Sequence, residues 1–142
     1  ISCLPGAKQN KFHVIYVKDL ARAYYLAFKK KLTGINSFII GNQEAELMER
    51  IYTLFAEAAG LKKPSNLPKW LVYPLGFSLE LIYTILDIQQ PPILTRGRVN
   101  MFYDNLEFST AKAQEVLGFE QQYSLEEGIE KTVDWYQEHG FL

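Results

Sequence analysis

Cysteine and histidine are nearly absent from this chain of 142 residues, which holds one cysteine, Cys3, and two histidines, His13 and His139. A single thiol excludes an internal disulfide, and so few soft ligands exclude a multi-thiolate or histidine-rich metal centre. Neither histidine has a neighbouring serine or cysteine that would suggest a nucleophile. We therefore interpret His13 as a structural residue and His139 as a surface residue at a helix end.

A surplus of charge is also lacking, since 15 lysines and arginines face 16 aspartates and glutamates, for a net charge of -1. This balance argues against nucleic acid as a partner, because such binding needs a clustered positive surface. The N-terminus shows no basic-then-apolar order typical of a signal peptide, and we expect a cytoplasmic protein. The chain begins with Ile1 rather than methionine, and we expect it to be a piece of a larger protein.

A glycine-rich turn that could hold phosphate groups is missing, so no dinucleotide site is predicted on these residues. Tyr25 and Lys29 have the Tyr-x-x-x-Lys spacing that short-chain dehydrogenases use to move a proton. The spacing puts both side chains on one face of a helix. Two common residues at one spacing recur by chance, and we interpret this pair as coincidental.

The remaining pattern predicts a chain of mostly helices with a few short strands. Strands are predicted at His13–Val17 and Ser37–Ile40, because both runs are β-branched or aromatic. Ser124 and Glu127 form a capping box for a last helix with Leu125, Ile129, Val133 and Tyr136 on its buried side. The other predicted helices begin near Asp19, Leu47, Leu94 and Ser109, and Gly60, Gly118 and Gly140 end helices.

The longest apolar run extends from Trp70 to Leu86 and contains one charge, Glu80. It is too short and too broken to span a bilayer, because Pro74 and Gly76 predict an interruption before a longer helix from Phe77 to Leu86. Ordinary core, a wall for an apolar substrate and peripheral membrane attachment all remain open for this run. Beyond it, Arg96 and Arg98 are spaced to bind an anionic group, unless one of them is solvated surface.

Three stretches together resemble a known family, the extended short-chain dehydrogenase/reductases of the NAD-dependent epimerase/dehydratase superfamily. They are HVIYVKDLARAYYLAF, FIIGNQEAELMERIYTLFAEAAGL and the closing FSTAKAQEVLGFEQQYSLEEGIEKTVDWYQEHGFL. The resemblance implies an α/β, helix-rich fold with about five to six helices, in which residues 1–142 are a single C-terminal substrate-binding portion. It also implies that the N-terminal Rossmann domain, which binds NAD or NADP and carries the catalytic residues, is absent from this chain.

The order of the Pro-Pro-Ile-Leu-Thr-Arg segment, a helix and Phe-Ser-Thr-Ala-Lys-Ala resembles the 3β-hydroxysteroid dehydrogenase and dihydroflavonol reductase branch. That branch oxidises or reduces a hydroxyl/ketone pair on an apolar skeleton. Alternatives are a nucleotide-sugar epimerase or dehydratase, and a non-catalytic binding module. The nucleotide-sugar enzymes often carry an arginine where this chain has Phe12 and His13, with Lys11 as the nearest cation.

The resemblance implies an NAD(P)-dependent enzyme as parent and an apolar small molecule as substrate. Other expected partners are the N-terminal Rossmann part and a second copy of the chain, because the fragment alone would expose a sheet edge and an apolar face. We predict no metal, catalytic or cofactor-binding residue on this chain. The candidate substrate-binding residues are Trp70, Tyr73, Phe77, Arg96, Arg98 and Tyr103.

Overall fold

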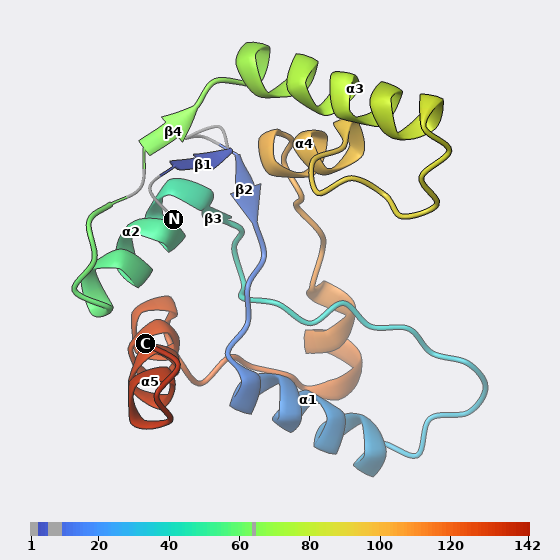
Figure 1. The fold of residues 1–142 in the computed structure, drawn as a ribbon. Helices are drawn as coiled ribbons and strands as arrows, with labels where there is room; N and C mark the ends of the chain where they lie inside the picture. Colours follow the sequence, from blue (N-terminus) through green and yellow to red (C-terminus); the bar gives the residue numbers. More distant parts are fainter. Residues whose placement is uncertain (1–2, 6–9, 64) are drawn as a thin grey trace.

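Helices dominate the structure, a computed structural model that describes residues 3–5, 10–63 and 65–142 of the chain. Ile1, from which we expect a larger parent, lies outside the described residues. Within the described part, five α-helices and one π-helical segment are joined by long connections and four short strands (Figure 1). The expected helix-rich α/β fold with five to six helices is confirmed.

A buried apolar cluster lies between helix α1 (Val17–Lys29) and the π-helical segment η1 (Ala113–Leu117). It consists of small and large apolar residues that exclude water where the two elements touch: Ala23, Ala113, Leu117 and Phe119. Gly118 ends η1 with φ +66°, a conformation that glycine adopts without steric cost. This end agrees with the sequence prediction.

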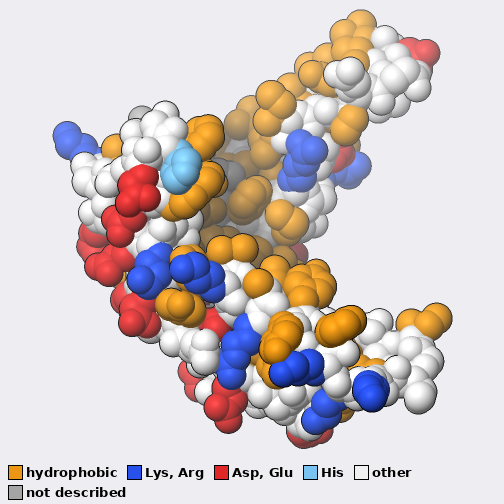
Figure 2. Space-filling view, turned by 90° about the horizontal axis from the view of Figure 1, so that it is seen from below, with side chains coloured by type: hydrophobic (Ala, Val, Ile, Leu, Met, Phe, Trp, Pro, Cys, Tyr) orange, Lys and Arg blue, Asp and Glu red, His pale blue; other side chains and the backbone are white. Residues whose placement is uncertain are grey.

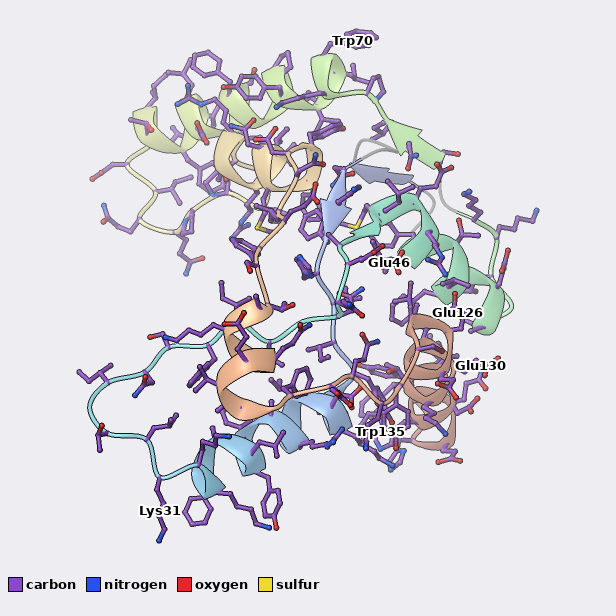
Figure 3. The ribbon with its side chains drawn as sticks, turned by 180° about the vertical axis from the view of Figure 1, so that it is seen from behind. Lys31, Glu46, Trp70, Glu126, Glu130 and Trp135 are labelled. Carbon is purple, nitrogen blue, oxygen red and sulfur yellow. The ribbon has the colours of Figure 1, made fainter. Side chains whose placement is uncertain are left out.

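Helices α2 (Met48–Ala58) and α5 (Leu125–Glu138) pack against each other on one side of the molecule (Figure 1). α2 follows strand β3 (Glu46–Leu47), which pairs antiparallel with β2 (Lys11–Phe12). The Arg50 guanidinium binds both the Glu46 carboxylate at 2.7 Å and the Glu126 carboxylate at 2.5 Å, which ties α2 to the start of α5 (Figure 3). The predicted capping box of α5 is confirmed, since Ser124 and Glu127 bond each other's backbone N–H.

The other end of the molecule is an arm made of α3 (Lys69–Ile85), a turn over residues 86–95, and α4 (Arg96–Tyr103). We call these elements the α3–α4 arm. Beside it, strand β1 (Cys3–Pro5) pairs parallel with β4 (Ser65–Leu67), so the connection before α3 contains a strand that the sequence did not predict. Within the described ranges, no helix has both the length and the apolarity that crossing a bilayer requires.

The predicted strand at His13–Val17 is wrong, because Val17 already begins α1 and residues 13–16 are not part of a ladder. Val14 exchanges hydrogen bonds with Asn42 alone, donating from its N–H to Oδ1 at 3.0 Å and accepting from Asn42 N–H at 2.9 Å. A strand needs a continuous neighbour for its backbone groups. Residues 13–16 have no such neighbour among the described residues.

The predicted strand at Ser37–Ile40 is also wrong, since these residues are extended chain without a ladder partner in the described part. The apolar side chains of Phe38 and Ile40 instead pack against the cluster between α1 and η1. The β-branched and aromatic composition that suggested a strand therefore reflects partial burial against this cluster and not strand pairing.

The predicted interruption at Pro74 and Gly76 is wrong too, because α3 continues through both residues. Pro74 removes one backbone donor, which the rest of the helix tolerates. Gly76 has a packing reason: a Cβ there would lie 3.3 Å from the carbonyl carbon of Thr95. α4 begins at Arg96 and not at Leu94, because the Thr95 side chain caps it by accepting from Arg98 N–H at 3.1 Å.

Candidate functional site

Tyr73 and Phe77 lie one helical turn apart on α3 and face the start of α4, as the spacing of four residues requires. The Arg96 guanidinium carbon lies 5.1 Å from the centre of the Phe77 ring, within the range of a cation–π contact. Both aromatic rings remain partly exposed, Tyr73 at 37% and Phe77 at 47%. Together these three residues form an accessible surface with apolar rings and one cation.

Arg96 is held in place by Glu80, one turn beyond Phe77 on the same helix. Glu80 Oε1 accepts from the Arg96 backbone N–H at 2.7 Å, and Oε2 accepts from Nε at 2.6 Å. The hydrogen bond from the guanidinium lowers the pKa of Glu80 below its ordinary value, and the same bond raises the pKa of Arg96. The Tyr73 side chain adds a smaller contribution that also raises the pKa of Arg96. We call Tyr73, Phe77, Glu80 and Arg96 the arm cluster.

Arg98 points elsewhere and does not form an anion-binding fork with Arg96. Its Nη1 donates to the carbonyl oxygens of Pro92 at 3.1 Å and Ile93 at 2.7 Å. These bonds fasten the proline-containing turn to α4, so Arg98 holds the shape of the arm.

Tyr103 and Trp70 also lie apart from the arm cluster. The Tyr103 hydroxyl donates to the carbonyl of Leu67, which ties the end of α4 to β4. Trp70 is 76% exposed and extends away from the body of the molecule (Figure 3). Of the six predicted substrate-binding residues, the structure therefore brings Tyr73, Phe77 and Arg96 together.

A groove of about 880 Å³ lies elsewhere, between residues 14–18, α2 and α5, and none of the predicted site residues lines it. Its apolar lining includes Ile15, Ile51, Phe55, Leu125, Ile129 and Trp135, and its polar lining includes Lys18, Asn42, Lys131, Asp134 and Glu138. Sequence reasoning missed this groove because its walls come from segments that lie far apart in the sequence. The apolar stripe of the last helix was the one local signal for it.

The hydroxyls on the α5 side of the groove are already engaged. Ser124 caps α5, and the Thr132 hydroxyl donates to the carbonyl of Gly128 at 2.6 Å. Tyr16 and Tyr123 meet edge to face with ring centres 4.9 Å apart, and Lys131 Nζ lies 5.9 Å from the Tyr123 ring. The groove thus offers an apolar floor and a charged rim, without a paired nucleophile and base among its described side chains.

The buried carboxylate of Asp19 fixes the loop that enters α5. It is 1% exposed and accepts from the backbone N–H groups of Gln122 and Tyr123, each at 3.1 Å. The sequence placed Asp19 at a helix start, which is correct to within two residues. Its bonds to a loop more than 100 residues away could not be predicted from the local pattern.

Four residues for which the sequence predicts no catalytic role contact other groups of this chain: Tyr25, Lys29, His13 and His139. Lys29 Nζ lies 4.6 Å from the centre of the half-exposed Tyr25 ring. His13 Nδ1 lies 3.1 Å from the Asn42 carbonyl oxygen, and His139 Nδ1 lies 2.7 Å from that of Trp135. No group of three metal-ligating side chains occurs in the part of the chain that the structure describes.

The described residues do not fit a nicotinamide dinucleotide. Among the described glycines, four have positive φ, but Gly60, Gly118 and Gly140 follow the ends of helices and Gly34 lies in a connection. None of these glycines forms a turn from a strand into a helix, where a phosphate group would bind. We derive no cofactor step from this chain.

No family model matches the chain. The chain is 27% identical over 140 residues to 3beta-hydroxysteroid-dehydrogenase/decarboxylase isoform 1 of Arabidopsis thaliana, covering 91% of this chain and 32% of that protein. It is 27% identical to 2-alkyl-3-oxoalkanoate reductase of Shewanella oneidensis, covering 90% and 35%. It is 37% identical to an uncharacterized protein of Escherichia coli, YbjS, covering 98% and 42%. The chain thus spans less than half the length of each of these relatives.

Two solved structures show the same fold. The crystal structure of gox2253 superimposes with a TM-score of 0.70 at 23% identity, covering 96% of this chain and 40% of that one. UDP-glucose 4-epimerase from Bifidobacterium longum, solved with NAD+ and UDP, gives a TM-score of 0.57 at 13% identity, covering 93% and 31%.

The fold and these matches together show which class of proteins this chain resembles. The chain is similar, over nearly all of its length, to the C-terminal part of extended short-chain dehydrogenase/reductases, including proteins named as 3β-hydroxysteroid dehydrogenases. The resemblance seen in the sequence is thereby confirmed.

Proposed function

We propose that this chain is the C-terminal, substrate-binding portion of an NAD(P)-dependent oxidoreductase that acts on a hydroxyl/ketone pair of an apolar substrate, sterol-like or isoprenoid. The observation that carries the proposal is the match over nine-tenths of the chain to proteins named for oxidation or reduction of steroid and alkyl-oxo-acid compounds. In this proposal the nicotinamide and the catalytic residues belong to an N-terminal Rossmann part of the cytoplasmic parent, outside the present chain.

The arm cluster supplies the substrate-facing chemistry of the proposal. Phe77 and Tyr73 offer apolar rings that are open to a ligand, and each 100 Å² of apolar surface removed from water contributes roughly 2.5 kcal/mol to binding. Arg96 adds one fixed cation at the edge of this wall, held by Glu80. Arg98 and Tyr103 then support the arm through their hydrogen bonds, and Trp70 extends away from it; none of the three touches the substrate directly in this proposal.

An epimerase or dehydratase of nucleotide sugars is the second candidate, favoured by the fold shared with UDP-glucose 4-epimerase. Lys11 is the nearest cation to the region where this alternative needs a nucleotide contact, and it lies 3.7 Å from the Glu107 carboxylate.

A non-catalytic module with the same fold is the third candidate, and the upstream gene sequence distinguishes it from an enzyme. An intact glycine turn and Tyr-x-x-x-Lys pair favour the enzyme, and their loss favours the module.

A thermal-shift screen of the full-length protein separates the two enzymatic candidates. We expect a sterol-like ketone, added with NAD(P)H, to raise the melting temperature, and UDP-sugars to leave it unchanged. The Phe77→Ala variant should lose most of the shift caused by the ketone and keep the shift caused by NAD(P)H alone. Stabilisation by UDP-sugars with indifference to the ketone would replace the proposal with the second candidate.

A further inference from the structure

The guanidinium of Arg96 has one edge engaged and one edge open. Its Nε donates to Glu80 at 2.6 Å, whereas Nη1 and Nη2 form no hydrogen bond with a carboxylate or a carbonyl among the described residues. The side chain is 46% exposed, so a ligand can reach the open edge from solvent. Two parallel N–H donors on a planar guanidinium match the two oxygens of a carboxylate. The arm cluster therefore offers a pair of donors to an anionic group.

The bond to Glu80 does not prevent Arg96 from holding a second carboxylate. Arg50 in the same chain shows this capacity, because its Nη1 donates to Glu46 and its Nη2 donates to Glu126. One exposed guanidinium thus binds two carboxylates through separate nitrogens. At Arg96 the first carboxylate is that of Glu80, and the remaining nitrogens are available to a ligand.

Glu80 also fixes the direction of the open edge. Its Oε1 accepts from the backbone N–H of Arg96 at 2.7 Å, and its Oε2 accepts from Nε of the same residue. A donor that is already oriented loses little conformational freedom when a ligand binds. The contact with Glu80 therefore prepares the guanidinium for an anion and does not compete for the same nitrogens.

Aromatic rings of α3 lie beside this charge. The centre of the Phe77 ring is 5.1 Å from the guanidinium carbon, and the Tyr73 side chain lies near enough to raise the pKa of Arg96. An apolar ring keeps water from part of the guanidinium, which strengthens a charge-assisted hydrogen bond at its edge. In the space-filling view, Lys and Arg side chains lie among hydrophobic side chains on the projecting arm (Figure 2). Such a surface suits a ligand with an apolar body and one anionic group.

The other cations of the arm are engaged with protein groups. Lys69 pairs with Asp104 at 3.3 Å, and Arg98 donates from Nη1 to two carbonyls of the turn. Among the described residues of the arm, Arg96 is therefore the cation placed to meet a ligand that lies on the aromatic rings.

We infer that the substrate of the parent enzyme carries a carboxylate on its apolar skeleton, and that Arg96 binds this carboxylate through Nη1 and Nη2. The skeleton then lies on Phe77 and Tyr73. This inference deepens the proposed function and rests on it, because it assigns a charge to the same substrate. Arg96 is thus a specificity-determining residue. A neutral analogue of the same shape would lose the charge-assisted bonds and bind more weakly.

Calorimetric titration of the full-length protein in the presence of NAD(P)H tests the inference with two probes, decanoate and decanamide. They share one aliphatic chain and differ in charge. The first variant, Arg96→Gln, removes the guanidinium. The second, Arg96→Lys, keeps a cation that can pair with Glu80 but lacks the planar edge. The matched control is Arg50→Gln, which removes a carboxylate-binding guanidinium outside the arm.

We expect the unaltered protein and Arg50→Gln to bind decanoate about tenfold more tightly than decanamide. Arg96→Gln should bind both probes equally, with the affinity for decanamide unchanged, and Arg96→Lys should keep only part of the preference. Equal affinities in the unaltered protein, or a preference that persists in Arg96→Gln, would overturn the inference. If Arg96→Gln also weakens decanamide binding, the arm has lost its order and Arg96→Lys decides: a full preference there contradicts binding through the planar edge.

Nicotinamide fluorescence on the same samples tests the proposed function separately. A protein that binds NAD(P)H and treats decanoate and decanamide alike would keep the proposed function and lose this inference. A protein that prefers decanoate through Arg96 but binds neither cofactor would keep the anion-binding site and lose the oxidoreductase.

Discussion

The Glu80 carboxylate binds Arg96 twice, through the backbone N–H that opens α4 and through the guanidinium Nε of the same residue. One side chain on α3 thereby fixes both the start of α4 and the direction in which its first cation points. The pair also sets the position of the guanidinium over Phe77. The shape of the proposed substrate wall depends on this contact.

Replacing Glu80 by glutamine should lower the melting temperature of the full-length protein by a few degrees at pH 7. The pKa of Glu80 in the folded protein is below its ordinary value of 4.5, because Arg96 stabilises the carboxylate. Its contribution to stability is therefore present above about pH 4.5 and is lost as the pH falls further, through the lowered pKa. Melting curves across this range should show the difference between the variant and the parent shrinking in acid.

The control for this measurement is Glu57→Gln, an exposed carboxylate on α2. We expect that variant to melt with the parent protein at every pH. A Glu80→Gln protein that behaves in the same way would show that the contact with Arg96 contributes nothing to the arm.

Gly76→Ala should destabilise the arm by about 1–3 kcal/mol, because the added Cβ would lie 3.3 Å from Thr95 C and 3.4 Å from Arg96 N. Backbone atoms cannot move aside as a flexible side chain can. Gly97→Ala is the matched control, since its Cβ would meet nothing nearer than Thr95 Oγ1 at 3.9 Å. Within α4 that change should be neutral or stabilise by up to roughly 1 kcal/mol. Chemical denaturation of both variants checks the ranking, and equal effects would contradict close packing of α3 on α4.

Helix ends were predictable where a side chain or a glycine marks them locally. Ser124 and Glu127 predicted the start of α5 correctly, and Gly118 predicted the end of η1. Strands were not predictable in the same way, because a β-branched or aromatic run becomes a strand only beside a partner. Residues 13–16 and 37–40 lack a ladder partner among the described residues, so their β-branched and aromatic composition led to a wrong assignment.

The composition of the arm cluster was predictable in part. Tyr73, Phe77 and Arg96 were predicted to bind substrate because of their aromatic or cationic side chains. Glu80 was noted only as the single charge in an apolar run. Its role follows from the turn that brings Arg96 back across 16 residues, and no local pattern encodes that turn. The interruption predicted at Gly76 failed for the same reason, since the glycine serves contact with a later helix.

Asp19→Asn should reduce the free energy of unfolding by about 2–3 kcal/mol. Both carboxylate oxygens of Asp19 accept a backbone N–H, and an amide would present its own donor to one of these groups. The control, Asp134→Asn, changes an exposed carboxylate on α5 and should stay within roughly 0.5 kcal/mol of the parent. Urea titrations of the two variants make the comparison. Equal midpoints would mean that the loop before α5 does not depend on Asp19.

Phe77→Ala should raise the KM for an apolar ketone roughly tenfold, the loss expected when a ligand no longer buries against an aromatic ring. Its effect on stability should stay below about 1 kcal/mol, because the ring is half exposed. Val72→Ala, at a site 3% exposed, should show the reverse ranking, with about 2 kcal/mol lost and KM nearly unchanged. Steady-state kinetics and thermal melts on the full-length enzyme make the comparison. A Phe77→Ala protein that loses stability without a change in KM would identify Phe77 as core.

Titration of the full-length protein with NADH and NADPH, followed by nicotinamide fluorescence, tests the central claim most directly. We predict saturable binding of at least one reduced cofactor to the folded protein, with an affinity that the substitution Phe77→Ala leaves unchanged. A folded full-length protein that binds neither cofactor would contradict the proposal that this chain is the substrate-binding portion of an NAD(P)-dependent oxidoreductase.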